Sequence, residues 1–172
     1  MTQKAIMLIL LMLGILALLL SMRRRGGRHA RYRWRAGEAW KTLSRDRRSA
    51  GETLTYLRKT NPYVFEEMVL DAFERNGYKA MRNSRYSGDG GVDGRVRKDG
   101  KTYLVQCKRY KGFVDAGDVE RFAHLCRESG MDGFFVHTGK TGRKSKLNAS
   151  YGNVKIVSGN KLIGLFYETL YS

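Results

Sequence analysis

Residues 103–110 read YLVQCKRY, a pattern typical of a buried β-strand. Because side chains alternate along a strand, the residues at positions 103, 105 and 107 are expected on one face. The opposite face then carries Leu104, Gln106 and Lys108, so an amide and an ammonium there must reach water or take part in a function. A glycine-rich segment with two acids, SGDGGVDGRV, lies just upstream at residues 87–96. The fold depends on whether these two segments pair.

The flanking sequence predicts a mixed α/β domain. Asn61 is a good helix N-cap and Pro62 a favoured first helical residue, so a helix is expected from there to Gly77. The sequence KDG at residues 98–100 predicts a hairpin turn. Strands are expected at 78–81, 92–97, 101–109, 133–138 and 153–157, helices at 115–129 and 160–170, and a basic loop or short helix after residue 138. Helical connections between strands favour a mixed sheet covered by helices.

Composition points to a polyanionic partner. The chain has 172 residues, a formal net charge of +17 and a sequence pI of about 10.2. Such an excess of positive charge is typical of proteins that bind nucleic acid or an anionic membrane surface. The two cysteines, Cys107 and Cys126, are far apart in the sequence and are expected to be free thiols in a reducing compartment.

The N-terminal segment differs from the rest of the chain. Residues 5–20 read AIMLILLMLGILALLL without a charge, and an arginine triplet follows at 23–25. A cleaved signal peptide needs a small-residue cleavage site, which the sequence lacks, so an uncleaved single-span anchor over residues 1–22 is favoured. The basic residues after it predict, by the positive-inside rule, a cytoplasmic domain on a bacterial-type inner (plasma) membrane.

Residues 23–60 are interpreted as a basic, partly helical juxtamembrane linker, which would leave residues 61–172 as the main domain. The linker is rich in arginine, with Tyr32, Trp34 and Trp40 among the basic residues. Its position next to the apolar segment favours contact of residues 23–35 with lipid headgroups. For the remainder, contact with DNA phosphates and a solvated charged helix are both open.

A hairpin would bring the two opening segments together. In residues 92–96 the valines share one face, and Asp93 with Arg95 the other. If this strand pairs with the next one, Asp93, Gln106 and Lys108 can reach one spot, although the sequence does not fix the register.

Such a group has the chemistry of a magnesium site. Carboxylate and amide oxygens are the ligands that Mg²⁺ prefers, and a nearby lysine can handle a proton or stabilise charge on a phosphate. A further acid would complete the site. Glu66 and Glu67 on the first helix are both candidates, because the phase of the helix is uncertain by a residue.

Four segments together resemble the catalytic domain of Mrr-type restriction endonucleases, a branch of the PD-(D/E)xK nuclease superfamily. They are FEEMVLDAFERNGY at 65–78, SGDGGVDGRV, YLVQCKRY, and GFFVHTG at 133–139. The resemblance covers residues 61–171. It implies a restriction-endonuclease-like mixed central sheet flanked by helices. This branch carries QxK where most of the superfamily has D/ExK, so Gln106 follows the pattern of the branch.

The resemblance also implies roles for particular residues. Asp93 would be the central metal ligand, Gln106 would take the ligand position of the second strand, and Lys108 would be the catalytic lysine. Glu66 would be the accessory acid and third metal-site residue, and Asp89 would support the site. The implied activity is hydrolysis of DNA phosphodiesters with Mg²⁺ or Mn²⁺.

Basic residues near this site are expected to contact double-stranded DNA, namely Arg109, Lys140, Arg143, Lys144 and Lys146. The main hypothesis is a membrane-anchored DNA endonuclease with a restriction or DNA-processing role. A homodimer would fit it, because cutting both strands needs two active sites. The alternatives are a membrane-tethered DNA-binding module that does not cleave, and a Holliday-junction-type resolvase.

Overall fold

A computed structural model describes residues 3–46, 48–83 and 91–167, and within helix α1 the side chains at 3–6, 8, 17–26 and 28 are outside this description. The helices are α1 Gln3–Arg45, α2 Ala50–Lys59, α3 Pro62–Arg75, α4 Ala116–Ser129, α5 Arg143–Ser150 and α6 Asn160–Tyr167. The strands are β1 Lys79–Arg82, β2 Gly94–Lys98, β3 Lys101–Lys108, β4 Asp132–His137 and β5 Val154–Val157. The predicted mixed α/β order is confirmed.

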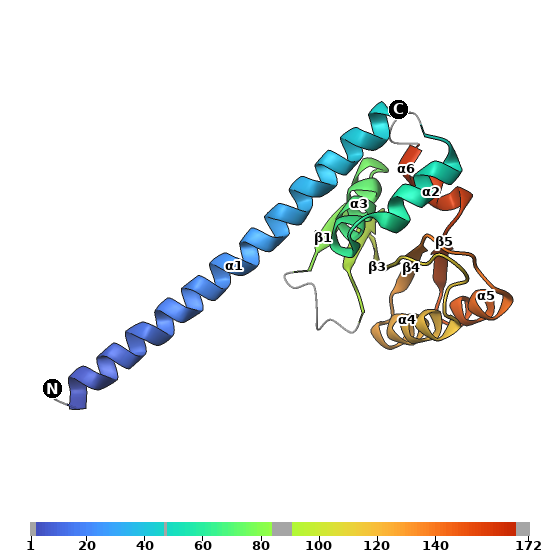
Figure 1. Ribbon diagram of the computed structural model, residues 1–172. Coiled ribbons are helices and arrows are strands. Elements are labelled where there is room, and N and C mark those ends of the chain that lie inside the picture. Colours follow the sequence, from blue (N-terminus) through green and yellow to red (C-terminus); the bar gives the residue numbers. More distant parts are fainter. Residues whose placement is uncertain (1–2, 47, 84–90, 168–172) are drawn as a thin grey trace.

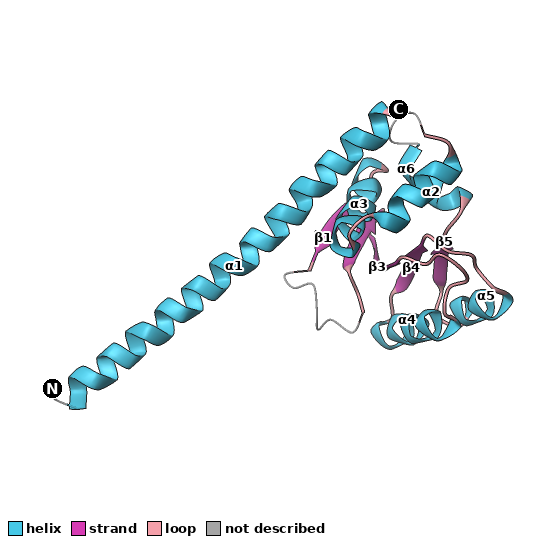
Figure 2. Ribbon diagram, in the orientation of Figure 1, coloured by secondary structure: helices cyan, strands magenta, loops and turns pink. Residues whose placement is uncertain are grey.

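The five strands form one sheet in the order β1-β2-β3-β4-β5 (Figure 2). The strands β1, β2 and β3 are antiparallel neighbours, whereas β3, β4 and β5 run parallel. The hairpin between β2 and β3 turns at Asp99 and Gly100, which both have positive φ, as a two-residue turn requires. The strand β3 is therefore the centre of the sheet, where antiparallel and parallel pairing meet.

Both faces of the sheet are covered, so the chain has two hydrophobic clusters. One face packs against α3 and α6 and includes Val105 and Phe134, while the other packs against α4 and α5 and includes Leu104 and Phe135. The two crossovers through α4 and α5 each lead to the next parallel strand, and both helices lie on the same face (Figure 1). This is the result expected for successive right-handed crossovers in one direction.

Local signals begin the helices where the sequence predicts. The side chain of Asn61 accepts a hydrogen bond from the Tyr63 N–H, and Pro62 occupies the first turn of α3. Helix α2 begins with a capping box in which Ser49 and Glu52 satisfy each other's backbone N–H groups. These caps set the direction in which α2 and α3 approach the sheet.

Helix α1 joins the core through its C-terminal part. Its residues Ala36, Ala39, Trp40 and Leu43 are buried, and the Trp40 ring stacks on Phe166 of α6 with centroids 4.8 Å apart. These positions repeat at the spacing of one helical face. The hydrophobic core therefore starts inside the segment that was expected to be a linker, well before Asn61. The pattern is hard to see in the sequence because arginines surround it.

The N-terminal part of α1 projects away from the sheet as the continuation of the same helix (Figure 1). In the described part of the chain, no helix is both long enough and apolar enough to cross a membrane. The transmembrane helix expected from the sequence is thus not found there. Many side chains of that segment, including those at 17–22, are outside the described residues.

Candidate active site

A cavity of about 260 Å³ opens beside the C-terminal end of β3. We call it the site cavity. It is lined by Pro62, Phe65, Glu66, Gly91, Asp93, Gln106, Cys107, Lys108 and Arg109. The helix α3, the segment before β2 and the strand β3 each contribute to it. The structure therefore brings together Glu66, Asp93, Gln106 and Lys108, which the sequence had only predicted to meet.

The register of the hairpin places Asp93 directly at β3. Gly94 pairs with Val105 at the end of the ladder, and Asp93 directly precedes this pair. The backbone N–H of Asp93 donates to the Val105 carbonyl at 2.8 Å, and Asp93 Oδ2 accepts from the Cys107 N–H at 2.6 Å. One carboxylate oxygen is thus fixed by the neighbouring strand. The whole side chain is held in one orientation at the edge of the cavity.

The two adjacent glutamates of α3 point to different places, which decides between them. Glu66 is half-buried and lines the site cavity. Glu67 is 2% exposed and accepts a hydrogen bond from Arg82 Nε at 2.9 Å, with His29 Nδ1 at 3.9 Å. Successive helical residues lie about 100° apart, so only one of the two can face the cavity. Of the two, Glu66 lines the site cavity, and Glu67 belongs to an ion-pair network between α1, α3 and β1.

The carboxylates of the site cavity are held in an environment that disfavours their charge. Burial, followed by the charges of Asp93 and Glu67, raises the pKa of Glu66 to about 8. Burial likewise raises the pKa of Asp93 to about 6, although the hydrogen bond from the Cys107 N–H and the charge of Lys108 both lower it. Two buried acids in a shared pocket would be stabilised in their charged form by a cation placed between them.

Gln106 supplies a third oxygen. Its side chain is 7% exposed, and its Oε1 atom is buried without a hydrogen-bond partner among the described residues. A buried acceptor without a partner is unfavourable by about 1–3 kcal/mol, which a cation ligand would remove. Gly91, at φ +93°, is required beside it, because a Cβ there would lie 2.7 Å from Gln106 Nε2. Sequence reasoning did not single out Gly91.

The donor set fits a hard divalent cation. Two carboxylates and one amide supply oxygen atoms only, the preference of Mg²⁺ and Mn²⁺. Over the described residues, no group of three or more His, Cys, Asp and Glu side chains is placed to hold a metal ion. Glu66, Asp93 and Gln106 are the residues that would hold the cation.

Two arginines position the elements around the site. Arg109 lines the cavity, but its Nη1 donates to the carbonyls of Arg58 and Thr60 at 3.0 and 2.5 Å. Arg58 in turn donates from Nε and Nη2 to the Thr138 carbonyl at 3.0 and 2.8 Å. These bonds connect α2 to the ends of β3 and β4. Arg58 was not predicted, since a basic residue in a basic helix gives no distinct signal.

The other predicted DNA contacts lie beyond β4. Lys140, Arg143, Lys144 and Lys146 are all exposed, on the loop after β4 and on α5. Lys140 lies over the Phe113 ring at 6.0 Å, and the backbone of Val114 bonds to the Lys140 carbonyl at 2.9 Å. The loop after β4 and the start of α5 are therefore basic and exposed. Asp89, expected to support the site, is outside the described residues.

An oxygen-donor pocket with a lysine, at the end of the central strand of a mixed sheet, defines a protein of the restriction-endonuclease-like class. A family model described as "Restriction endonuclease" (Mrr_cat) matches residues 57–166. The chain belongs to this family of deoxyribonucleases.

Similar proteins include one curated relative and two solved structures. The type IV methyl-directed restriction enzyme EcoKMrr of Escherichia coli K12 is 32% identical over 129 residues, covering 69% of this chain and 42% of that enzyme. The protein of unknown function AF1548 superposes with a TM-score of 0.48 at 20% identity, over 64% of this chain and 65% of that one. The MspJI restriction endonuclease in complex with a 27-mer oligonucleotide superposes with a TM-score of 0.44 at 22% identity. This match covers 76% of this chain and 30% of that one. The chain thus spans less than half of the curated relative.

Proposed function

We propose that the protein is a DNA endonuclease that hydrolyses phosphodiester bonds at the site cavity with Mg²⁺ or Mn²⁺. The observation that carries this proposal is the convergence of Glu66, Asp93, Gln106 and Lys108 on one cavity. Each residue comes from a different part of the sequence, apart from the pair on β3. Such a convergence of two acids, an amide oxygen and an ammonium has a simple chemical purpose in a nuclease.

The roles of the residues follow from their surroundings. When bound by Glu66, Asp93 and Gln106, a divalent cation supplies Lewis-acid stabilisation of negative charge on the phosphate. Asp93 is fixed by the Cys107 N–H, so it binds without reorganising. Lys108 lies close enough to lower the pKa values of both carboxyls, and its ammonium can donate to a phosphate oxygen. Without a cation, Glu66 retains its proton at neutral pH, because its pKa is about 8.

The proposed substrate is double-stranded DNA. The net charge of +17 and the exposed basic residues after β4 favour a polyanion at this edge of the sheet. The relative EcoKMrr is described as methyl-directed, which makes methylated DNA the first substrate to compare. Cleavage of both strands requires two site cavities, so we propose a homodimer during cleavage, and light scattering with and without duplex DNA would measure it.

Cleavage assays test the endonuclease directly. The full-length chain is incubated with unmodified plasmid, methylated plasmid and branched DNA, in Mg²⁺ or in EDTA. We expect cleavage that needs the cation and is lost in Asp93→Asn and Lys108→Ala. The matched control is Lys111→Ala, which removes an exposed charge just beyond β3 and should cleave normally.

Other outcomes separate the alternatives. Tight binding without cleavage on all three substrates would support a DNA-binding module. Cleavage restricted to branched DNA would support a junction resolvase. Cleavage that survives EDTA or both substitutions would contradict the proposed chemistry.

We also propose that residues 5–22 hold the protein at a bacterial-type inner membrane, with the nuclease domain in the cytoplasm. The support is the uncharged sequence, the arginines after it, and the exposure of its described side chains, such as Leu10 at 63% and Met12 at 66%. Sedimentation of membranes from expressing cells tests this. The protein should stay in the pellet after a carbonate wash, and placing charges at Leu10 and Leu13 should release it. Recovery of the unchanged protein in the supernatant would contradict the anchor.

A further inference from the structure

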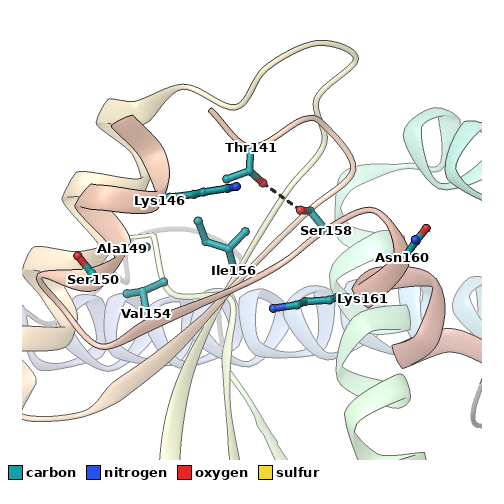
Figure 3. A pocket seen from close by; sticks show the side chains of 9 residues that line it. All are labelled: Thr141, Lys146, Ala149, Ser150, Val154, Ile156, Ser158, Asn160 and Lys161. Carbon is teal, nitrogen blue, oxygen red and sulfur yellow. Dashed lines mark hydrogen bonds between the residues drawn. The ribbon is translucent and has the colours of Figure 1, made fainter. Parts of the chain in front are cut away.

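A second cavity, of about 500 Å³, lies between α5 and the edge strand β5 (Figure 3). Its lining residues are Thr141, Lys146, Ala149, Ser150, Val154, Ile156, Ser158, Asn160 and Lys161. The floor is apolar, whereas hydroxyl and ammonium groups surround the opening. Figure 3 shows the ammonium group of Lys146 directed toward Thr141 and Ser158, and the side chain of Lys161 extending from α6 toward the side of Ile156.

The charged residues that line the second cavity are both lysines. None of the described residues that line it is an acid. Neither Lys146 nor Lys161 forms an ion pair with a carboxylate in the described part of the chain, and both are exposed. Asn160 and Lys161 also begin α6, and the N-terminus of a helix favours negative charge. The cavity therefore attracts an anion.

Hydrogen bonds beneath the cavity leave one donor directed outwards. The Gly139 N–H donates to His137 Nδ1 at 3.2 Å, so the hydrogen of this buried, neutral imidazole is on Nε2. That nitrogen lies 3.1 Å from Thr141 Oγ1 and donates to it, and Thr141 Oγ1 lies 3.0 Å from Ser158 Oγ. The hydroxyls of Thr141 and Ser158 carry two hydrogens, and the hydrogen bond between them uses one. The other hydrogen can be donated to a ligand. Burial also lowers the pKa of His137 to about 4, so the imidazole stays neutral at neutral pH and Nε2 donates to Thr141.

The strand register connects this cavity with the active site. Lys108 pairs with His137, and Ser158 directly follows Val157, which pairs with Val136. The hydroxyl of Thr141 joins His137 to Ser158, at 3.1 and 3.0 Å. Lys108, His137 and Ser158 thus lie side by side at the C-terminal ends of three parallel strands. Neighbouring strands are about 4.8 Å apart, so the row spans roughly 10 Å. This distance is on the scale of the separation between phosphates of nearby nucleotides on one DNA strand.

We propose that the second cavity binds a backbone phosphate of the same DNA strand, close to the bond that is cut. Lys146 and Lys161 bind the phosphate by charge, and the Thr141–Ser158 pair donates a hydrogen bond to it. The inference rests on the proposed endonuclease function, since it assumes that DNA crosses the row of strand ends. Binding of this phosphate would fix the position of the enzyme along the DNA backbone without any contact to a base.

Binding of a fluorescent 20-base-pair duplex to the full-length chain, in Ca²⁺ and over a series of salt concentrations, tests the proposal. The variants are Lys146→Ala, Lys161→Ala and Ser158→Ala. The control is Lys155→Ala, on the same strand β5, where Lys155 faces Tyr103 and Phe134 on the opposite side of the sheet. We expect about a tenfold loss of affinity for each lysine variant, a smaller loss for Ser158→Ala, and no loss for Lys155→Ala. The slope of log affinity against log salt should fall by about 0.9 for each lysine.

Inorganic phosphate and dAMP are used as competing probes. If they bind at the second cavity and the lysine variants lose only this binding, the cavity takes a free phosphate and the DNA assignment is wrong. Wild-type affinity for the duplex in both lysine variants would also overturn it.

The outcome is separable from that of the proposed function. If the chain cuts no DNA but its affinity for the duplex depends on Lys146 and Lys161, the phosphate site is supported and the endonuclease proposal fails. If both lysine variants cut and bind DNA as well as the wild type, the endonuclease is supported and the phosphate-site proposal fails.

Discussion

The site cavity and the second cavity lie at the same edge of the sheet and have opposite chemistry. The first collects oxygen atoms, with two carboxyls whose pKa values are raised to about 8 and about 6. The second collects two ammonium groups and a hydroxyl pair, with no acid in its described lining. The first sets its two carboxyls beside Lys108 and Arg109, whereas the charged residues of the second are both lysines. The difference indicates that one cavity is completed by a cation and the other by an anion.

A DNA strand with its divalent cation supplies both. Its phosphates carry the negative charge that the second cavity needs, and the cation neutralises the site cavity. The row of Lys108, His137 and Ser158 joins the two across β3, β4 and β5. The following experiments alter one cavity while leaving the other intact.

The largest effect is expected from Gly91→Ala. A Cβ at position 91 would lie 2.7 Å from Gln106 Nε2, so the amide must move, and DNA cleavage should fall by about 100-fold. Gly100→Ala is the matched control, because Gly100 has a similar φ of +78° with open space around it. Initial cleavage rates measure both variants. Equal rates for Gly91→Ala and Gly100→Ala would show that the position of Gln106 does not matter.

A smaller effect is expected on stability when Mg²⁺ is added without DNA. At a Mg²⁺ concentration of 100 Kd, binding to the folded state alone stabilises by about 2.7 kcal/mol, which raises the melting temperature by roughly 5–10 °C. Glu66→Gln should lose most of this rise. The exposed Glu120→Gln and the second-cavity variant Lys161→Ala should keep it. A full rise in Glu66→Gln would exclude Glu66 from the cation site.

The pH dependence of the cation-free protein gives a further test. The folded pKa of Glu66, about 8, is above the ordinary value of 4.5, so folding favours the protonated carboxyl. This stabilising contribution is fully present below pH 4.5 and is lost as the pH rises through 8. In EDTA, Glu66→Gln should therefore become more stable than the wild type between pH 5 and pH 9, by on the order of 1–3 kcal/mol. Chemical denaturation at several pH values measures the difference, and a constant difference would contradict the buried carboxyl pair.

The smallest effect is expected from Lys161→Ala on the unfolding free energy. Lys161 is exposed and has no carboxylate partner among the described residues, so removing it should change stability by no more than about 0.5 kcal/mol. Thermal melts of both proteins in EDTA measure this. A larger loss would mean that weaker DNA binding in this variant reflects unfolding.

Much of the fold could be predicted from the sequence because the signals are local. The cap at Asn61, the turn at Asp99 and Gly100, and the alternation along β3 each act within a few residues. The burial of Trp40 could not be predicted in this way. Its partner Phe166 is far away in the sequence, and the arginines around Trp40 resemble those of a solvated helix.

The candidate site also has features that the sequence predicts and features that depend on tertiary packing. The residue types of Asp93, Gln106 and Lys108, together with their spacing, are sufficient to indicate the chemistry and the family. The choice of Glu66 over Glu67 depended on the rotation of α3 against the sheet, which is set by packing. Gly91 and Arg58 were missed because their contacts, to Gln106 and to the Thr138 carbonyl, cross between elements.

The sequence by itself thus determined the order of helices and strands, the residue types of the site and the family, since these depend on local patterns and spacing. Only the tertiary structure decided the strand pairing that brings Asp93 and Gln106 to one cavity, the orientation of Glu66, and the row that connects the two cavities. The physical reason is that pairing and packing join residues from distant parts of the chain, and a shift of one position would turn each side chain to the other face.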